Sequence, residues 1–376
     1  MRRKKQFYEK EREILQELSH KLDKGFVIKN FYLFNKIKKV MQYAEEQKAI
    51  PTVLLTLALK KISTPKQNIT KHMKKLRGGF NARSLDTKVI TPFLQKRDFI
   101  CMKESGWTTR SLAQPYPYSK KYNFNFKSKE LGPLFLDLIE DMNKLSIDPN
   151  NVALYILYLL KKEKRNRPQA DRTPIKELSI ISIRDILYYF QKHREDVVIS
   201  GKARIPVLQV YSALSFCEQK INHKNSETFL EKKLSHHNSS DSSSNKQGDI
   251  HRFCKKTKEA TQIFEIKDRE LSIQDIDYII SNKVNEISNH IIINFLTTHE
   301  VSAELIDHCR KVSNEKIEVL VEEVDRFILN ILAASGSIDF SKVLLIYSHL
   351  IEADKTVKNS HIKKWNNIIK TNEKAA

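Results

Sequence analysis

The sequence predicts an α/β (α+β) protein, in which a small mixed sheet flanked by helices is embedded in a largely helical chain. Glycine and proline are scarce, at 8 and 10 of 376 residues, and hydrophobic residues make up 40%, as is typical of a globular protein rich in helices. Apolar residues recur at helical spacing over most of the chain. Short runs with strand character cluster between residues 249 and 298.

The chain is long enough for two or three cooperating units. We expect a helical, basic region at residues 1–200, the sheet at residues 201–300 with a mobile loop at 222–248, and a helical region at 301–376 that packs or dimerises. The four cysteines form no CxxC pair, and no signal peptide or apolar run of membrane-spanning length is visible. The expected compartment is therefore a reduced cytoplasm, with no membrane partner and no structural zinc.

Positive charge is concentrated in the first third of the chain. Residues 1–130 hold 30 Lys and Arg against 11 Asp and Glu, a surplus of +19, whereas residues 131–376 hold 36 against 34, a surplus of +2. A surplus of this kind favours a polyanionic partner, because each phosphate neutralised by Lys or Arg releases condensed counterions. The alternative is a lysine-rich surface that only keeps the protein in solution.

Helices are expected first, throughout residues 1–63. Pro51 introduces an apolar segment at 52–63, which predicts a buried helix because it is too short to span a membrane. In the cationic segment that follows, Lys71, Lys74 and Lys75 recur at i, i+3 and i+4. On a helix they would share one face, which could follow a phosphate backbone or simply be solvated.

Residues 80–124 combine arginine, lysine and glutamine with aromatic residues and several prolines. Arginine and glutamine can make bidentate contacts to purine edges, and aromatic residues between proline kinks form rigid walls. The segment therefore predicts a surface that reads DNA sequence. Its candidate DNA-binding residues are Arg83, Lys88, Trp107, Arg110, Gln114 and Tyr118. The alternative is a loop between helices in which the aromatic residues only pack.

Helical spacing returns at residues 129–162, 181–193 and 203–221. The polar loop at 222–248 follows, and its His236 and His237 read as solvated residues, because a flexible tract lacks the rigid surroundings of a metal site. Glu218, at the end of the preceding helix, is a further acidic candidate, although an exposed helix-end acid is the better interpretation.

Three residues form the candidate catalytic site: Asp249, Glu265 and Lys267. Composition alone predicts about six acid-x-Lys triplets by chance, so context must decide between them. Alternation along a strand at 263–267 places Glu265 and Lys267 on one face, and Asp249 begins a strand at 249–253 that could pair with it. A helix at 272–288, an apolar strand at 290–298 and further helices, including one across 319–332, complete the pattern.

The runs ARSLDTKVITPF and MKESGWTTRSLAQPYPY, together with RIPVLQVYSAL and the GDI and EIK motifs, resemble the SacI-like family of type II restriction endonucleases. The order strand, strand, helix, strand is similar to the core of the PD-(D/E)xK nucleases. The resemblance implies Mg²⁺ held by Asp249 and Glu265, with Lys267 orienting or activating the attacking water. One departure is that Asp249 follows Gly248 and not proline.

The family implies hydrolysis of both strands of double-stranded DNA at a short specific sequence, which leaves 5′-phosphate ends. It also implies a companion DNA methyltransferase that protects the host. A homodimer is expected, because a two-fold assembly cuts a palindromic site on both strands most simply. Two alternatives are a repair or transposition nuclease of the same fold and a non-catalytic sequence-specific DNA-binding protein.

Overall fold

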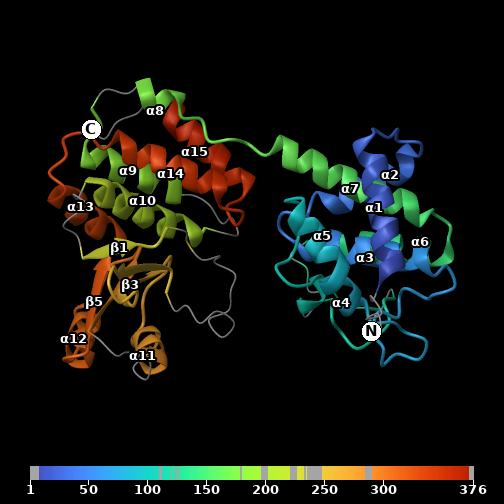
Figure 1. The fold of residues 1–376 in the computed structure, drawn as a ribbon, viewed down its shortest axis with the longest axis horizontal. Coiled ribbons are helices and arrows are strands. Elements are labelled where there is room, and N and C mark those ends of the chain that lie inside the picture. The colour runs from blue at the N-terminus through green and yellow to red at the C-terminus, as the bar shows by residue number, and fades with distance from the viewer. Residues whose placement is uncertain are drawn as a thin grey trace. The chain divides into compact units, whose positions relative to one another are not determined.

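The computed structural model describes residues 8–109, 112–119, 121, 122, 124, 126, 128–177, 180–195, 202–220, 227–232, 234, 248–283 and 290–371. The chain divides into two compact units between Arg167 and Pro168 (Figure 1). This boundary lies earlier than the expected one after residue 200. The reason is that α8 (Thr173–Glu177) and α9 (Ile183–Arg194) pack against α14 (Ser341–Ala353) and α15 (Asn359–Thr371) of the second unit. Most of the loop expected at 222–248, with His236 and His237, lies outside the described residues.

The described residues of the first unit form helices and connecting turns, with no strand among them. Its elements are α1 (Glu9–Asp23), α2 (Phe31–Met41), α3 (Ala49–Ser63), α4 (Ala82–Leu85), the π-helix η1 (Asp86–Ile90), α5 (Thr91–Lys96), the 3₁₀ turn η2 (Gly106–Thr108), α6 (Leu131–Lys144) and α7 (Pro149–Asn166). The helix α3 forms the centre, since 13 of its 15 residues are buried. α1, α6 and α7 pack around it, which confirms the buried helix predicted after Pro51.

Two findings refine the expectations for this unit. The described helices include none that is both long and apolar enough to cross a membrane. The prediction that Lys71, Lys74 and Lys75 share one face of a helix is wrong, because residues 64–80 form turns. The chain folds back tightly here, so that a Cβ on Gly79 would lie 2.1 Å from the carbonyl oxygen of Met73.

The second unit contains the sheet. Its helices are α8 (Thr173–Glu177), α9 (Ile183–Arg194), α10 (Arg204–Lys220), α11 (Ile273–Lys283), α12 (Ala303–Val312), α13 (Val324–Ala334), α14 (Ser341–Ala353) and α15 (Asn359–Thr371). Its strands are β1 (Thr228–Leu230), β2 (Ile250–Cys254), β3 (Ala260–Lys267), β4 (Ile291–Thr297) and β5 (Ile317–Glu323). A mixed sheet in a largely helical chain is therefore confirmed, and so are the strands predicted at 249–253, 263–267 and 290–298.

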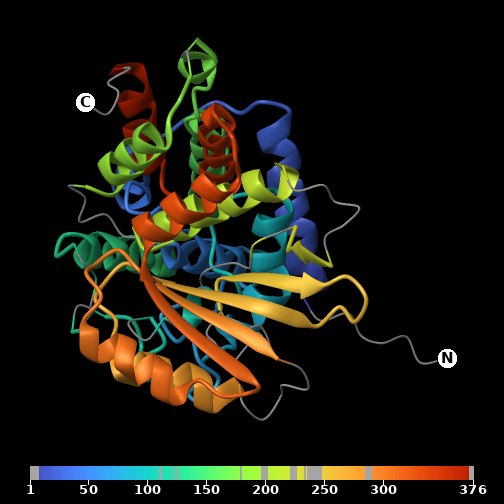
Figure 2. The same ribbon diagram turned by 90° about the vertical axis from the view of Figure 1, so that its left-hand side faces the viewer.

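The five strands lie in the order β1-β2-β3-β4-β5. The first three pair antiparallel, whereas β3, β4 and β5 run parallel. Parallel neighbours need long crossover connections, and here α11 and α12 provide them. Figure 2 shows the yellow-to-orange strands with these two orange helices along one face.

Each face of the sheet has its own core. On what we call the α11 face, Ile263, Phe295 and Val319 pack with residues of α11 and α12. On the opposite α10 face, Phe264 and Leu296 pack with α10, α13 and α14, and Figure 1 shows the sheet between these two groups of helices. A sheet covered on both faces explains why residues 291–297 are almost continuously apolar.

The strand β5 corrects one prediction. A helix was expected across residues 319–332, but residues 317–323 form β5 and the helix α13 begins at Val324. Ile317 and Val319 are buried while Glu318 and Leu320 are exposed, which is the alternation of a strand. The region after residue 300 thus adds a strand to the sheet, and does not only pack against it.

A buried histidine in this unit predicts acid sensitivity. His193 Nε2 lies 2.9 Å from the carbonyl oxygen of His361, so it must donate, and Nδ1 accepts from the Tyr347 hydroxyl at 2.6 Å. Burial, together with the charges of Lys364 and Arg194, lowers the pKa of His193 to about 3, although the hydrogen bond to His361 opposes this shift. The unfolded chain takes up this proton below about pH 6.5, whereas the folded chain does not until about pH 3, so stability falls as the pH drops between these values.

The free energy of unfolding should fall between pH 6.5 and pH 4.5 in the wild-type protein. We expect this fall to be smaller by roughly 2 kcal/mol in His193→Gln. Urea unfolding followed by circular dichroism at both pH values measures it. The matched control is His349→Gln, since His349 is exposed on α14. Equal losses in the wild-type protein and the His193 variant would assign the acid sensitivity to other groups.

Candidate functional site

The antiparallel pair β2–β3 brings Asp249 beside Glu265 and Lys267. Ile250 lies opposite Phe264, and the backbone N–H of Asp249 donates to the carbonyl oxygen of Phe264 at 2.9 Å. Both Ile250 and Phe264 belong to the core of the α10 face. Alternation therefore places Glu265 and Lys267 on the α11 face of β3. Asp249 directly precedes β2 and lies beside the end of β3.

Hydrogen bonds hold these side chains in place. Asp249 Oδ2 accepts from the backbone N–H of Ile266 at 3.0 Å, which fixes the carboxylate beside the end of β3. Lys267 Nζ donates to Glu265 Oε1. Glu265 is only 8% exposed, whereas the Lys267 side chain keeps 31% of its surface exposed. The site thus combines the nearly buried carboxylate of Glu265 with the more exposed ammonium group of Lys267.

The carboxylates also set the charge state of the lysine. Burial by itself would lower the pKa of Lys267, but the charge and hydrogen bond of Glu265 and the charges of Asp249 and Asp275 raise it above its ordinary value. At neutral pH Lys267 is accordingly an ammonium ion, and the charges of these three carboxylates stabilise it.

Gly248 has a backbone conformation that explains why no proline precedes Asp249. Its φ is +93°, in the left-handed region, and a Cβ there would lie 2.4 Å from Ile263 Cγ2 and 3.9 Å from Glu265 Oε2. Proline is locked near φ −65° and cannot take this conformation. Glycine is therefore required by the turn that enters β2, directly beside the Glu265 carboxylate.

The carboxyl ends of β3 and β4 are tied together just beyond the site. Thr297 Oγ1 donates to the carbonyl oxygen of Arg269 at 2.7 Å, and Thr298 Oγ1 donates to Asp268 Oδ1 at 3.0 Å. Arg269 also pairs with Asp275 at the start of α11, and the hydrogen bond from Arg269 holds the pKa of Asp275 well below its usual range. In open α/β sheets ligands bind outside the carboxyl ends of the strands. Here these contacts link the carboxyl ends of β3 and β4 to each other and to α11.

Sequence reasoning missed a second pair on the α11 face. Glu231 and His251 are 5% and 4% exposed, and Glu231 Oε1 accepts from the backbone N–H of His251 at 2.9 Å. The Glu231 carboxylate therefore completes the pairing of β1 with β2. Because Glu231 belongs to an acid-x-Lys triplet that composition explains by chance, no signal in the sequence marked it.

Glu218 does not join the site. It pairs with Arg252 at 3.0 Å, and Arg252 alternates with Asp249 and His251, so it lies on the α10 face. The described residues contain no group of three or more His, Cys, Asp or Glu side chains placed to hold a metal ion. A metal at the β2–β3 pair would rest on the two carboxylates of Asp249 and Glu265.

The candidate DNA-binding residues of the first unit divide by exposure. Arg83 and Lys88 are exposed and Gln114 is half-buried, whereas Arg110 lies outside the described residues. Trp107 and Tyr118 are 3% and 4% exposed, and Trp107 Nε1 donates to the Tyr118 hydroxyl at 3.1 Å. For these two aromatic residues the structure favours the alternative that they pack, because neither ring is open to a partner.

A buried aspartate organises this segment. The Asp86 carboxylate is fully buried and accepts from Thr91 Oγ1 at 2.7 Å, Ser105 Oγ at 2.6 Å and the backbone N–H of Gly106 at 2.7 Å. Burial raises the pKa of Asp86 although all three donors lower it. Gly106 in turn packs on α3, where a Cβ would lie 2.7 Å from Val53 Cγ2.

We expect Asp86→Ala to lower the free energy of unfolding by roughly 3 kcal/mol, because it leaves three buried donors without their acceptor. Thermal and urea unfolding measure the loss. Asp137→Ala is the matched control, since Asp137 is exposed on α6. A loss no larger than that of the control would show that the network does not hold the segment to α3.

A comparison with protein-family models finds no match to this chain. A comparison with curated proteins also finds none. The resemblance to the SacI-like family therefore stays a prediction, and any functional conclusion must depend on the geometry of the site.

Proposed function

We propose that the protein is a Mg²⁺-dependent type II restriction endonuclease, which hydrolyses both strands of double-stranded DNA at a short specific sequence and leaves 5′-phosphate ends. One observation carries the proposal. Asp249 directly precedes β2, and its carboxylate accepts a hydrogen bond from the backbone of β3, the antiparallel neighbour that bears Glu265 and Lys267 on one face.

The arrangement of elements supports assignment to the PD-(D/E)xK nucleases. Two antiparallel strands, a helix and a parallel strand follow one another as β2, β3, α11 and β4. The acid of the first strand and the acid-x-Lys triplet of the second meet at one edge of the sheet, as that fold requires. Gly248 replaces the proline of the motif for the conformational reason given above.

The residues present fit a magnesium ion. Mg²⁺ prefers hard oxygen ligands and is commonly held by one or two carboxylates together with waters and substrate phosphate. Asp249 and Glu265 supply two carboxylates, and Glu265 is nearly buried. When bound, the ion would stabilise charge on the phosphate oxygens and lower the pKa of a water molecule.

Lys267 contributes a positive charge at the same place. Its ammonium group is held by Glu265 and remains partly exposed. From that position it orients the attacking water or stabilises the charge that develops on the phosphate. Asp249 and Glu265 thus serve as metal ligands and Lys267 as the cationic catalytic residue.

DNA binding is assigned to the basic N-terminal part of the chain, with Arg83, Lys88 and Gln114 as contacts, and Arg110 among the candidates. A homodimer and a companion methyltransferase complete the proposed restriction system. Light scattering with and without DNA tests the dimer, and a monomer under both conditions would contradict it.

Incubation of plasmid DNA with the protein and Mg²⁺, with an EDTA control, tests the function. Discrete fragments are expected for a restriction endonuclease. A smear would indicate a nuclease of the same fold without sequence preference, and intact DNA would favour a non-catalytic DNA-binding protein. Sequencing the fragment ends then gives the recognition sequence.

A further inference from the structure

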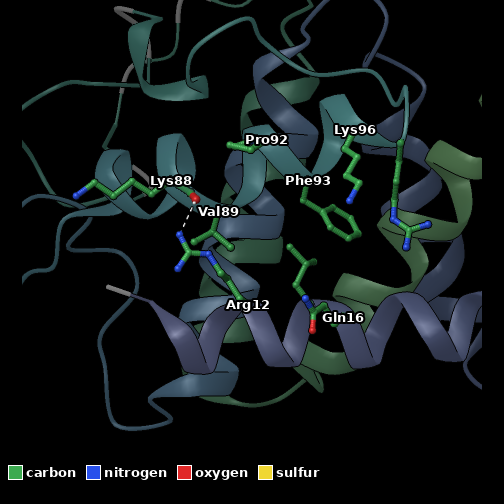
Figure 3. A pocket seen from close by; sticks show the side chains of 9 residues that line it. Arg12, Gln16, Lys88, Val89, Pro92, Phe93 and Lys96 are labelled. Carbon is green, nitrogen blue, oxygen red and sulfur yellow. Dashed lines mark hydrogen bonds between the residues drawn. The ribbon is translucent and has the colours of Figure 1, made fainter. Parts of the chain in front are cut away.

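A pocket in the first unit has a composition that the proposed cleavage site does not use. It has a volume of about 630 Å³ and lies between α1 and the segment formed by η1 and α5 (Figure 3). Leu15, Val89 and Phe93 provide apolar walls, and Arg12, Lys96 and Arg97 provide positive charge. Its volume is in the range of known ligand sites.

Helical spacing explains how these residues meet. Arg12, Leu15 and Gln16 follow one another at i, i+3 and i+4 and therefore share one face of α1. Phe93 and Lys96 lie at i and i+3 on α5. Figure 3 shows Arg12 and Gln16 on one side of the pocket and Phe93 and Lys96 on the other, while the side chain of Lys88 points away from Phe93.

The charges around the pocket are strongly positive. None of the residues that line it is acidic. Arg97 contacts Asp23 at 3.5 Å, but Asp23 also pairs with Lys161 at 2.7 Å, so one carboxylate is shared by two cations. Within the described part of the chain, the exposed Lys96 has no ion-pair or hydrogen-bond partner, and its ammonium group can therefore meet a ligand.

A planar surface lies beside this charge. The guanidinium group of Arg97 lies 4.9 Å from the centre of the Phe93 ring. Aromatic rings and guanidinium planes are the surfaces on which nucleobases stack. An apolar ligand alone would leave the cations unused, and a bare anion would leave the apolar walls unused.

We propose that this pocket binds a nucleotide unit, with its phosphate at Lys96 and its base against Phe93. A free mononucleotide and a nucleotide of a DNA strand present the same chemistry to the pocket, and the experiment below distinguishes these two sources. The inference goes beyond the proposed function, because binding requires neither Mg²⁺ nor the Asp249 site.

Isothermal titration of the full-length protein in EDTA tests the proposal with thymidine 5′-monophosphate, thymidine and inorganic phosphate as probes. Thymidine 5′-monophosphate is expected to bind at least about tenfold more tightly than thymidine or phosphate, because each of these lacks one half of the contacts. Lys96→Glu should weaken that binding about tenfold. The matched control Lys39→Glu, on the exposed face of α2, should leave it unchanged.

A second titration uses a short 5′-phosphorylated single-stranded oligonucleotide. If only the oligonucleotide binds, and Lys96→Glu weakens its binding more than Lys39→Glu does, the ligand is a nucleotide of a DNA strand. The proposal is overturned if neither probe binds, or if Lys96→Glu leaves the binding of both unchanged. Asp249→Ala is expected to leave these affinities unchanged, so failure of the nuclease proposal would not affect the result.

Discussion

Lys267→Ala is expected to lower the rate of plasmid cleavage at least about 100-fold, because it removes the ammonium group that is proposed to stabilise the charge developing on the reacting phosphate. Asp249→Ala should have an effect at least as large, since it removes one of the two proposed metal ligands. Lys267 donates to Glu265, and Asp249 is bonded to Ile266, so both changes act at the same strand end. Cleavage is measured with Mg²⁺, and DNA binding is measured in Ca²⁺ by gel shift.

Two substitutions on α12 in the same unit serve as matched controls. Lys311→Ala removes an exposed lysine, and Asp307→Ala removes an exposed aspartate. Both should retain cleavage. Loss of cleavage together with retained DNA binding in the Lys267 and Asp249 variants supports the assignment. Fragment production at the wild-type rate by either variant would exclude the site.

The sequence predicted the core of this site because strand periodicity is local. Alternation along 263–267 places Glu265 and Lys267 on one face, and the observed β3 has that arrangement. The position of Asp249 depended on the register of two strands separated by a turn. Composition does not determine that register. The structure shows it in the pairing of Ile250 with Phe264.

Other features depended on contacts that are distant in the sequence. The sequence predicts a helix where β5 lies, because the apolar residues of β5 run directly into those of α13 and also satisfy helical spacing. The packing of Trp107 against Tyr118 depends on a fold in the chain that composition does not reveal. The basic pocket is equally non-local, since α1 and α5 are separated by the whole of α2 and α3.

Gly248→Pro is expected to abolish cleavage, although it would restore the proline of the sequence motif. Gly248 has φ +93°, which proline cannot adopt, and a Cβ at this position would collide with Ile263 Cγ2 at 2.4 Å. The turn must therefore move, and Asp249 follows it directly. We expect cleavage to fall at least about 100-fold if Asp249 loses its place beside Glu265. Plasmid cleavage and thermal unfolding measure the two effects.

Alanine substitutions separate backbone strain from the collision. Gly336 also has a positive φ, +64°, but a Cβ there would meet nothing within 4 Å. Gly336→Ala should therefore cost roughly 1 kcal/mol of unfolding free energy and leave cleavage unchanged. The Cβ added by Gly248→Ala would collide with Ile263 and lie 3.9 Å from Glu265 Oε2. Gly248→Ala should therefore destabilise the protein more than Gly336→Ala does, and it should also reduce cleavage. Cleavage at the wild-type rate by Gly248→Pro would contradict the turn seen here. It would show that this position accepts the proline of the motif.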